Sequence, residues 1–600
     1  MTGVHSILHH VGKPSLDFDR ELATGVFRAG MRLVGASEVI VIPYLTVLSA
    51  IVRFGALLLS AAALLVASAL AARAAYLELR KFIVLFRIPH PPEEALLLGS
   101  ALAMRQPNHH RSLRAWAKQL GGVYAIRIAF WHMVVVVDAE LANRVHGNTE
   151  ALSKALEPDL SDKLMSHSSH RTLFSSDTNS PYWRLIRKGT APAFISKNIK
   201  NGFPDVVKIL DQIVDNMLKL APGEELDVNN VTLRFAMDVT GLVGFAKDYG
   251  TTRSFKDTGT DELFFILQST FRELYCRATN PVRHLMFWLP EVRRAPALFR
   301  VFRTRMMQLL QEVKARGEPG PEDVSIAAHL LRLRDPATGR PLPDALLAGE
   351  FGVFFAAGIE SAGNAISWTL YLLSQHPEVE CKLAQELDAA GLLVTPERPQ
   401  PRPMEFADLS RLTYLSWVCK EAMRVRPVAS SGTTRRARRD MDLGGYLVPK
   451  GSLLLVPFDA VHHYPGNWPQ DPDAFIPERW AVPGAELASA KGIPIPEVAS
   501  EHLLLIAADS KADDEAAATG PKRFLPFSIG PRQCIGQSLA RIMHDVTVAR
   551  LTAHFTLELA PRMGGPAGVD AAEINRLTLQ PGGGMWMRVH ARGRYLSNGC

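Results

Sequence analysis

The sequence predicts a mainly helical protein with a smaller β-rich lobe, preceded by an N-terminal transmembrane helix. Residues 54–72 form an uncharged apolar run, and Asp344–Gln375 is a second, longer apolar segment. Val123–Ile128 and residues 133–137 are rich in β-formers and flank an aromatic turn, a pattern typical of a hairpin. Helical patterns dominate the rest of the chain, so we expect the strands to form a minor lobe near the N-terminal side.

The composition is that of a large folded protein. Hydrophobic residues make up 47% of the 600 residues and charged residues 21%, which excludes a disordered or low-complexity chain. The 67 Lys and Arg residues exceed the 60 Asp and Glu residues by only 7, too dispersed an excess for a nucleic-acid-binding protein. The five cysteines include no CxxC pair, so a structural zinc site is not expected.

Residues 54–72 are predicted to be the membrane anchor, because a helix of that length nearly crosses the hydrocarbon core of a bilayer. The alternative interpretation is a buried Ala/Leu-rich core helix. The upstream apolar run, residues 39–52, is separated from the anchor by Arg53 and is predicted to be interfacial or re-entrant. Basic residues after the anchor place the following domain in the cytosol: Arg73, Arg80, Lys81 and Arg87 follow it, and Arg32 and Arg53 precede it.

The predicted organisation has five parts. Residues 1–53 form an N-terminal segment, residues 54–72 the anchor and residues 73–92 a basic, Pro-rich hinge. One catalytic domain spans residues 93–590, although the length alone would allow about four domains. Residues 591–600 are a tail. Residues 507–522 have the composition of an exposed insertion within the catalytic domain.

The segment Asp344–Gln375 is predicted to be one helix through the middle of the protein, since it is apolar on most sides. Gly358 and Gly363 lie near its centre, and each lowers helix stability by about 1 kcal/mol relative to Ala. Two explanations stay open for them: close approach of a flat ligand, or packing of a neighbouring helix. The polar exceptions on this helix are Glu350, Glu360, Ser361, Asn364 and Ser367.

Cys534 stands in the most specific motif of the sequence, FLPFSIGPRQCIG at residues 524–536, directly before an amphipathic helical pattern. The N-terminus of a helix favours a thiolate, and Gly530 and Gly536 permit close backbone approach. Such a cysteine suits a single metal bond, as in thiolate-ligated haem. A nucleophilic cysteine is the alternative interpretation.

The pattern Phe-x-x-Gly-x-Arg-x-Cys-x-Gly in this loop resembles the haem-binding loop of the cytochrome P450 haem-thiolate monooxygenases. Four further segments resemble motifs of that family in the family's order: WRLIR at 183–187, AGIES at 357–361, EAMR at 421–424 and PERW at 477–480. The membrane anchor and the Pro-rich hinge resemble those of its microsomal branch. The resemblance covers roughly residues 89–588.

The resemblance implies the mostly α, triangular cytochrome P450 fold and a haem b cofactor whose iron is bound by the Cys534 thiolate. Phe527 and Gly536 belong to the loop that would bind the haem. Glu421 and Arg424 share a helix face, and with Arg479 they are expected to form a buried ion cluster of structural importance. Four residues are expected to meet the haem propionates: Trp183, Arg187, Arg435 and Arg532.

The resemblance also implies a catalytic pair. Ser361 is the hydroxyl expected to hydrogen-bond dioxygen, and Glu360 is expected to connect it to solvent protons. The family usually has Thr at the place of Ser361, and Ser lacks the methyl group that restricts the rotamer. Proton delivery is therefore expected to be looser, with more peroxide released.

The predicted activity is insertion of one oxygen atom of O2 into a lipophilic small molecule, with electrons from NADPH delivered by a membrane-bound flavoprotein reductase. No nucleic-acid partner is expected. The predicted location is the endoplasmic reticulum membrane with the catalytic domain in the cytosol; the alternative is a plastid membrane. The reductase is expected to dock near Cys534 on a basic face, made of Arg184, Lys188, Lys522, Arg523 and Arg541.

Two other functions stay open. A hydroperoxide isomerase or dehydratase with the same fold needs neither O2 nor a reductase, but such proteins usually lack the acid–alcohol pair kept here as Glu360 and Ser361. A non-enzymatic haem- or sterol-binding membrane protein is the third possibility, and an intact relay argues against it. Dependence of turnover on a reductase separates the first alternative from a monooxygenase.

Several conspicuous residues receive no catalytic role. The histidine pairs at 9–10, 109–110 and 462–463 share no metal-ligand spacing and are predicted to be surface or loop residues. Phe354, Phe355 and residues 429–431 are candidates for substrate contact, although core packing explains the phenylalanines equally well. The remaining cysteines are assigned no role: Cys276, Cys381, Cys419 and Cys600.

Overall fold

The computed structural model describes residues 38–92, 98–128, 131–154, 172–254, 283–481 and 520–593, with positions 266, 268–270, 272–273 and 276–277 between them. The chain divides into two compact units, Met1–Arg80 and Lys81–Cys600. Most of the expected insertion at 507–522 lies outside the described residues, as do His9 and His10.

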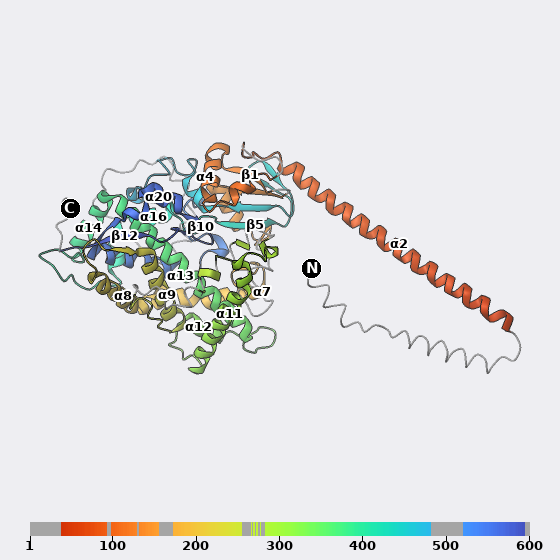
Figure 1. Cartoon of the computed structure of the whole chain (residues 1–600), viewed down its shortest axis with the longest axis horizontal. Coiled ribbons are helices and arrows are strands. Elements are labelled where there is room, and N and C mark those ends of the chain that lie inside the picture. The colour runs from red at the N-terminus through yellow and green to blue at the C-terminus, as the bar shows by residue number, and fades with distance from the viewer. Residues whose placement is uncertain are drawn as a thin grey trace. The chain divides into compact units, whose positions relative to one another are not determined.

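One long helix, α2 (Glu38–Leu85), contains both N-terminal apolar runs (Figure 1). Its part from Val47 to Leu85 is long and apolar enough to cross a membrane, and none of its most apolar window is buried. The helix does not break at Arg53, because arginine interrupts an apolar run but is a good helix former. It also continues past residue 72, so the non-helical part of the expected hinge is confined to residues after Leu85.

The central helix of the second unit is α13 (Asp344–Gln375), with the boundaries that the sequence predicts. Phe351, Phe355 and Ile359 on it are fully buried, and burying each such side chain contributes about 1.5–3 kcal/mol. This helix is also apolar enough to span a membrane, but 67% of its most apolar window is buried inside the protein. Its apolar character therefore reflects the core of the unit.

Helix α9 (Val228–Phe245) packs on α13 at the two glycines. A Cβ at Gly358 would lie 2.6 Å from Thr240 Oγ1, and a Cβ at Gly363 would lie 2.8 Å from Leu233 Cα. These distances are shorter than any normal contact, so a larger residue would push the helices apart. Of the two explanations that the sequence leaves open, the structure supports helix packing.

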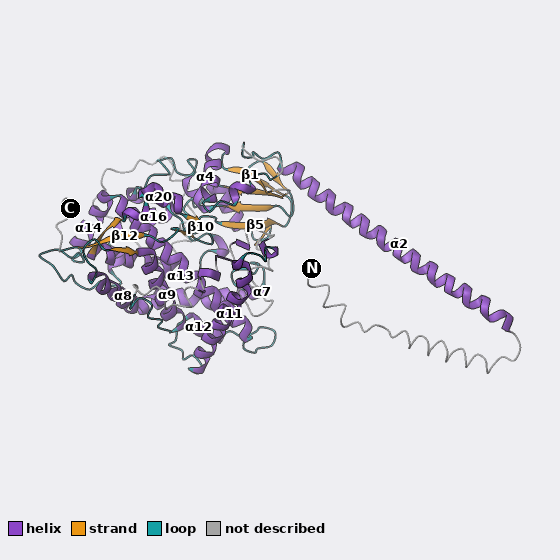
Figure 2. Ribbon diagram, in the orientation of Figure 1, coloured by secondary structure: helices purple, strands orange, loops and turns teal. Residues whose placement is uncertain are grey.

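The other helices appear purple in Figure 2 and lie in the second unit. Their bounds are α3 (Ala101–Met104), α4 (His109–Leu120), α5 (Ala139–Gly147), α7 (Pro181–Thr190), α8 (Ser196–Leu218), α11 (Pro290–Ala315), α12 (Ile326–Arg332), α14 (Pro377–Ala389), α15 (Asp408–Arg411), α16 (Thr413–Val425), α17 (Phe458–His463), α19 (Gln537–His554) and α20 (Gly565–Ala572).

The main sheet has five strands in the order β1-β2-β8-β5-β3. The predicted hairpin is confirmed: β1 (Val123–Ile128) pairs antiparallel with β2 (Trp131–Val136). The next strands, β8 (Leu453–Val456) and β5 (Thr433–Ala437), come from more than 290 residues later, and β8 runs parallel to β2. The β-rich lobe therefore does not belong to the N-terminal side alone, because parallel pairing joins distant segments. Strand β3 (Leu152–Lys154) pairs antiparallel with β5 and is the last strand of the sheet.

Three smaller sheets complete the fold. A three-stranded sheet has the order β4-β12-β9, and two hairpins are β6–β7 and β10–β11. Their bounds are β4 (Glu225–Asp227), β6 (Met441–Leu443), β7 (Tyr446–Val448), β9 (Phe555–Leu559), β10 (Ile574–Asn575), β11 (Leu579–Gln580) and β12 (Trp586–Ala591). The β10–β11 hairpin lies beside α13, because the Trp368 indole N–H of α13 donates to the Leu579 carbonyl of β11 at 3.0 Å; β10 and α13 are labelled in Figure 1.

The substitution Gly363→Ala tests whether α9 dictates this glycine. Helix propensity alone would stabilise the protein by about 1 kcal/mol, whereas overpacking against Leu233 destabilises a core by about 1–3 kcal/mol. We expect a lower denaturant midpoint for this variant. Gly320→Ala is the control, because a Cβ at Gly320 meets nothing within 4 Å. A higher midpoint for Gly363→Ala would contradict the packing explanation.

Candidate active site

Cys534 lies at the end of a tight loop that leads into α19. Its backbone N–H donates to the Phe527 carbonyl at 2.9 Å, which closes the loop. Gly530 has a φ of +73°, and a Cβ there would lie 3.0 Å from the His146 carbonyl oxygen. Ser528 also has a positive φ, 60°, which costs a non-glycine residue about 1–3 kcal/mol. The surrounding structure thus holds the cysteine loop in a conformation that the chain would not adopt alone.

Cys534 is an exposed residue, yet enough protein surrounds its thiol for burial to raise the pKa of the thiol. The Gly536 N–H and the Arg187 guanidinium act in the opposite direction, because each favours the thiolate. Cys419 is instead fully buried, and burial raises its thiol pKa well above the usual range. An open thiol that faces an N–H group and a cation is the better metal ligand of the two.

A strip of small side chains interrupts the burial of α13. Ala357 is exposed, and Ser361 and Ala365 are half-buried, although the residues between them are mostly buried. The three are spaced by four residues, so they share one face of the helix. The Ser361 hydroxyl donates to the Ala357 carbonyl at 2.7 Å. This face leaves room for a flat group against the middle of the helix.

The ring of Phe194 links α13 to the cysteine loop. It stacks on Phe354 of α13 with ring centroids 6.1 Å apart. Its Cε1 atom also lies 3.6 Å from the place that a Cβ of Gly536 would take. Phe354 is therefore engaged in packing, and Phe355 is too, since it packs on Tyr249 at 5.5 Å. Core packing accounts for both phenylalanines.

The four residues expected at the haem propionates come together from three separate segments. The Arg532 guanidinium lies 4.9 Å from the centre of the Trp183 ring. Burial, together with the positive charges of Arg435 and Arg187, lowers the pKa of Arg532 to about 9. Arg435 is 5% exposed, and its Nη2 atom has no hydrogen-bond partner among the described residues. The Asp177 carboxylate opposes the lowered pKa of both Arg435 and Arg532. The cluster nevertheless holds three guanidiniums near this one carboxylate, so it carries excess positive charge and suits an anionic ligand.

Arg532 also braces a neighbouring segment, which the sequence does not indicate. Its Nη1 atom donates to the Ser176 carbonyl at 2.9 Å, and its Nη2 atom donates to the carbonyls of Leu173 and Phe174 at 3.2 and 2.9 Å. The Leu173 N–H in turn donates to Glu350 of α13 at 2.9 Å. The segment 172–176 is therefore held between the cysteine loop and the central helix.

The expected ion cluster around Glu421 is present and buried. Arg424 binds the Glu421 carboxylate with two N–H···O bonds of 2.8 and 2.9 Å, and Arg479 Nε adds a third at 3.2 Å. The indole N–H of Trp480 and the backbone N–H of Ile476 also donate to it, each at 3.0 Å. Although burial opposes ionisation, these cations and donors hold the pKa of Glu421 below its usual range.

Trp468 is the centre of this cluster, and no motif pointed to it. The guanidinium carbons of Arg424, Arg479 and Arg523 lie 5.3, 5.8 and 4.2 Å from the centre of its ring. Arg523 is 2% exposed and donates to the Asn467 carbonyl at 2.7 Å. Its assignment to a docking face was therefore wrong, because the aromatic ring and the carbonyl draw it into the core.

The described histidine pairs are buried, so the expectation of surface positions was wrong. His109, His110, His462 and His463 are all at most 5% exposed. Burial lowers the pKa of His462 to about 3, and its neutral Nε2 atom accepts the Leu525 N–H at 2.7 Å. A neutral imidazole can satisfy backbone groups in a core, which residue spacing alone does not reveal.

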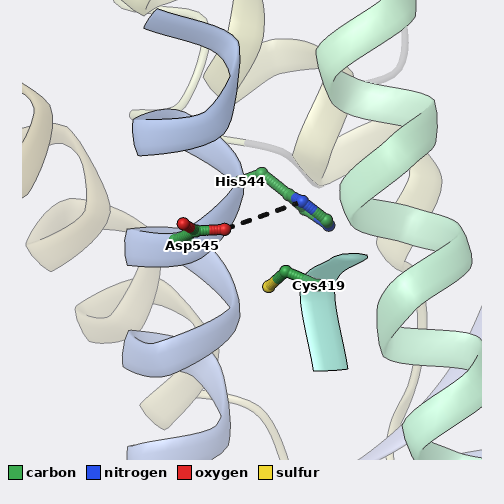
Figure 3. Close-up of side chains that lie close together, drawn as sticks. All are labelled: Cys419, His544 and Asp545. Atoms are coloured by element: carbon green, nitrogen blue, oxygen red, sulfur yellow. Dashed lines mark ion pairs between the residues drawn. The ribbon is translucent and has the colours of Figure 1, made fainter. Parts of the chain in front are cut away.

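Cys419 approaches two residues of α19, His544 and Asp545 (Figure 3). One ligand atom from each residue lies within 4.8 Å of the others. Thr369 donates its hydroxyl to the Ala365 carbonyl, so His544 Nε2, 2.7 Å away, must donate to Thr369. His544 Nδ1 then faces Asp545 at 3.9 Å, and Asp545 accepts a hydrogen bond from the Cys419 thiol. We interpret this cluster, which excludes Cys534, as a polar contact among α13, α16 and α19.

Glu360 lies beside the strip of small residues, but its carboxyl is buried. The side chain is 8% exposed, and burial raises its pKa to about 7. Its Oε2 atom accepts the hydroxyl of Thr578 at 3.3 Å. Glu360 and Ser361 are therefore adjacent on α13, as the motif requires, while Thr578 is a neighbour from a distant hairpin that the sequence did not indicate.

The comparisons with known proteins agree on one family. The family profile described as Cytochrome P450 matches residues 89–567. Cytochrome P450 3A13 of Mus musculus is 25% identical over 421 residues, which are 69% of this chain and 75% of that protein. Cytochrome P450 734A1 of Arabidopsis thaliana is 28% identical over 461 residues, 74% of this chain and 77% of its own. Cytochrome P450 monooxygenase sphH of Aspergillus fumigatus is 24% identical over 499 residues, which are 78% of this chain and 82% of that protein.

Removing the central carboxylate by Glu421→Ala is expected to cause loss of folded protein. The change leaves Arg424 and Arg479 buried without their anion, which destabilises a fold by about 3–5 kcal/mol. Circular dichroism under urea measures the loss. Glu478→Ala is the control, because the ion pair of Glu478 with Lys382 is partly exposed and contributes about 0–1 kcal/mol. Equal urea midpoints for the two variants would exclude a structural role for the cluster.

Proposed function

Because this chain belongs to the cytochrome P450 family, we propose that it is a membrane-anchored, haem-thiolate monooxygenase. It inserts one oxygen atom of O2 into a lipophilic small molecule. The observation that carries the proposal is the exposed residue Cys534, in a strained loop near a cluster of arginines with excess positive charge. This combination matches the two chemical needs of a haem: one soft ligand for the iron and several cations for the propionates.

The residues present fit a haem b group. Cys534 would bind the iron, while Phe527 and Gly536 would form the loop beneath it. The propionates would accept hydrogen bonds from the N–H groups of Arg187, Arg435, Arg532 and the Trp183 indole. The Nη2 atom of Arg435, which has no partner among the described residues, supports this assignment. When bound with a thiolate ligand, haem supplies the activation of dioxygen. The small side chains of Ala357, Ser361 and Ala365 would leave space beside α13 for oxygen and substrate.

Glu360 and Ser361 of α13 would transfer protons into the site. With a pKa of about 7, the Glu360 carboxyl is about half protonated at neutral pH, so it can both take up and release a proton. The Ser361 hydroxyl rests on the Ala357 carbonyl, and rotation about χ1 would turn it toward a ligand on the strip. A serine rotates more freely than a threonine, which supports the expectation of peroxide release.

The electrons would come from NADPH through a flavoprotein reductase. Arg184, Lys188 and Arg541 are exposed, and Lys522 is half-buried. These four residues would form the basic docking face for an acidic partner. Arg523 is excluded from this face because it is buried. A requirement for the reductase would separate this activity from a hydroperoxide isomerase or dehydratase, which needs no electrons. Absence of NADPH consumption with every lipophilic compound tested would favour a binding protein.

The reduced, CO-bound absorption spectrum tests the iron ligand. We expect the strongly red-shifted Soret band of a thiolate-ligated haem in the wild type and its loss in Cys534→Ala. Cys419→Ala is the matched control: it removes the buried thiol that contacts α19 and should keep the band. A band typical of histidine-ligated haem in the wild type, or loss of the thiolate band only in Cys419→Ala, would contradict the assignment of Cys534.

The apolar part of α2 supports anchoring in a membrane, and we assign it to the endoplasmic reticulum with the catalytic domain in the cytosol. In microsomes the full chain should stay with the membranes after alkaline carbonate extraction. A tag after residue 600 should be digested by protease added to intact microsomes. Release of the chain by carbonate would contradict a membrane span, and a protected tag would reverse the orientation.

A further inference from the structure

The β10–β11 hairpin is held against one face of α13. Glu360, Asn364 and Trp368 follow one another at intervals of four residues, so they share that face. The Trp368 indole N–H donates to the Leu579 carbonyl at 3.0 Å, and the Leu579 N–H donates to the Val428 carbonyl at 2.7 Å. Two segments thus fix the hairpin, and its turn residues have a defined place over Glu360 and Asn364.

Thr578, in the turn of this hairpin, joins a directional chain of hydrogen bonds. Asn229 of α9 donates its side-chain N–H to Asn364 Oδ1 at 2.8 Å, and Asn364 Nδ2 donates to Thr578 Oγ1 at 3.0 Å. Because the Thr578 oxygen already accepts from Asn364, its own proton is free to point to Glu360 Oε2, 3.3 Å away. Each hydrogen bond in this series is therefore donated in the direction that leads to the Glu360 carboxyl.

The charges around Glu360 are few. Burial disfavours its ionised form, and the Thr578 hydroxyl and the charge of Arg576 oppose this effect. Arg576 comes from the same hairpin, whereas α13 and α9 contribute the neutral amides Asn364 and Asn229. Within the described part of the chain, Thr578 is therefore the direct hydrogen-bond donor to a carboxyl group whose ionisation is finely balanced.

We propose that Thr578 is a positioning residue for Glu360: its hydroxyl holds the carboxylate against α13, and Asn364 sets the direction of that hydroxyl. When Glu360 releases a proton, its O–H bond breaks and a new O–H bond forms to the oxygen atom of a water or ligand molecule beside α13. The Thr578 O–H keeps its proton and donates a hydrogen bond to the carboxylate that forms. No electrons are transferred. The proposal rests on the proposed function only in giving Glu360 a proton to deliver.

Infrared difference spectroscopy tests the proposal without turnover. The carbonyl stretch of a protonated, buried carboxyl disappears on ionisation, and Glu360→Gln identifies the band of Glu360 in the haem-loaded protein. Thr578→Val removes the donor while keeping the shape of the side chain. We expect the titration midpoint of the band to rise by about one pH unit, a tenfold change in proton affinity. Thr578→Ser keeps the hydroxyl and should leave the midpoint close to that of the wild type.

Thr547→Val is the control, because it makes the same change at a threonine whose hydroxyl donates to the Met543 carbonyl of its own helix. Thr547 is buried, whereas Thr578 is half-buried. It should leave the Glu360 band unchanged. If Thr578→Val does not fold, as judged by circular dichroism, Thr578→Ala replaces it. An unchanged midpoint in the folded variant, or an equal rise in Thr578→Ser, would overturn the proposal.

A second readout separates this inference from the monooxygenase activity. With the reductase and NADPH, Thr578→Val should release more peroxide per NADPH consumed than the wild type, and Thr578→Ser should restore the ratio. If no substrate is oxidised but the infrared midpoint still rises, the proposed function fails and the positioning role stands. If oxidation occurs and neither the midpoint nor the peroxide ratio changes, the positioning role fails alone.

Discussion

One buried carboxylate, Glu421, is the interaction on which the rest of the catalytic unit depends. It carries a full charge in the core and accepts N–H groups from Arg424, Arg479, Trp480 and Ile476. A buried charge without such partners would be prohibitive, so these segments can only fold together. Arg424 extends the constraint to the carbonyls of His462, Pro472 and Ala474, and the arginines around Trp468 carry it to Arg523, which lies just before the cysteine loop.

The part of the candidate site that α13 contributes consists of two neighbouring rows of side chains on this helix. One row, Ala357, Ser361 and Ala365, stays open because its side chains are small. The adjacent row, with Glu360 and Asn364, is covered by the β10–β11 hairpin. The helix can carry both rows because α9 packs on Gly358 and Gly363 and occupies yet another face. An acid and a hydroxyl that are neighbours in sequence thus occupy different environments, one buried and one open.

The charged residues near Cys534 and those near Glu360 also differ. Arginines with excess positive charge gather near Cys534. Burial lowers the pKa of Arg187, Arg435 and Arg532, and the charges of the first two lower that of Arg532 further. Around Glu360, burial raises the pKa of the carboxyl to about 7, although the Thr578 hydroxyl and the charge of Arg576 oppose this effect. Under the proposed function, the arginines would serve an anionic cofactor and the Glu360 carboxyl would serve proton exchange.

The sequence by itself determined the elements whose evidence is local. The central helix, the first hairpin, the cysteine loop and the Glu421–Arg424 pair follow from periodicity and short spacing, because residues three or four apart on a helix must share a face. Only the tertiary structure decided the contacts between distant segments: the pairing of β8 with β2, the burial of Arg523 and the histidines, and the place of Thr578 over Glu360. These depend on which segments meet in space, and hydrogen bonding between residues more than 200 positions apart leaves no periodic signal in one sequence.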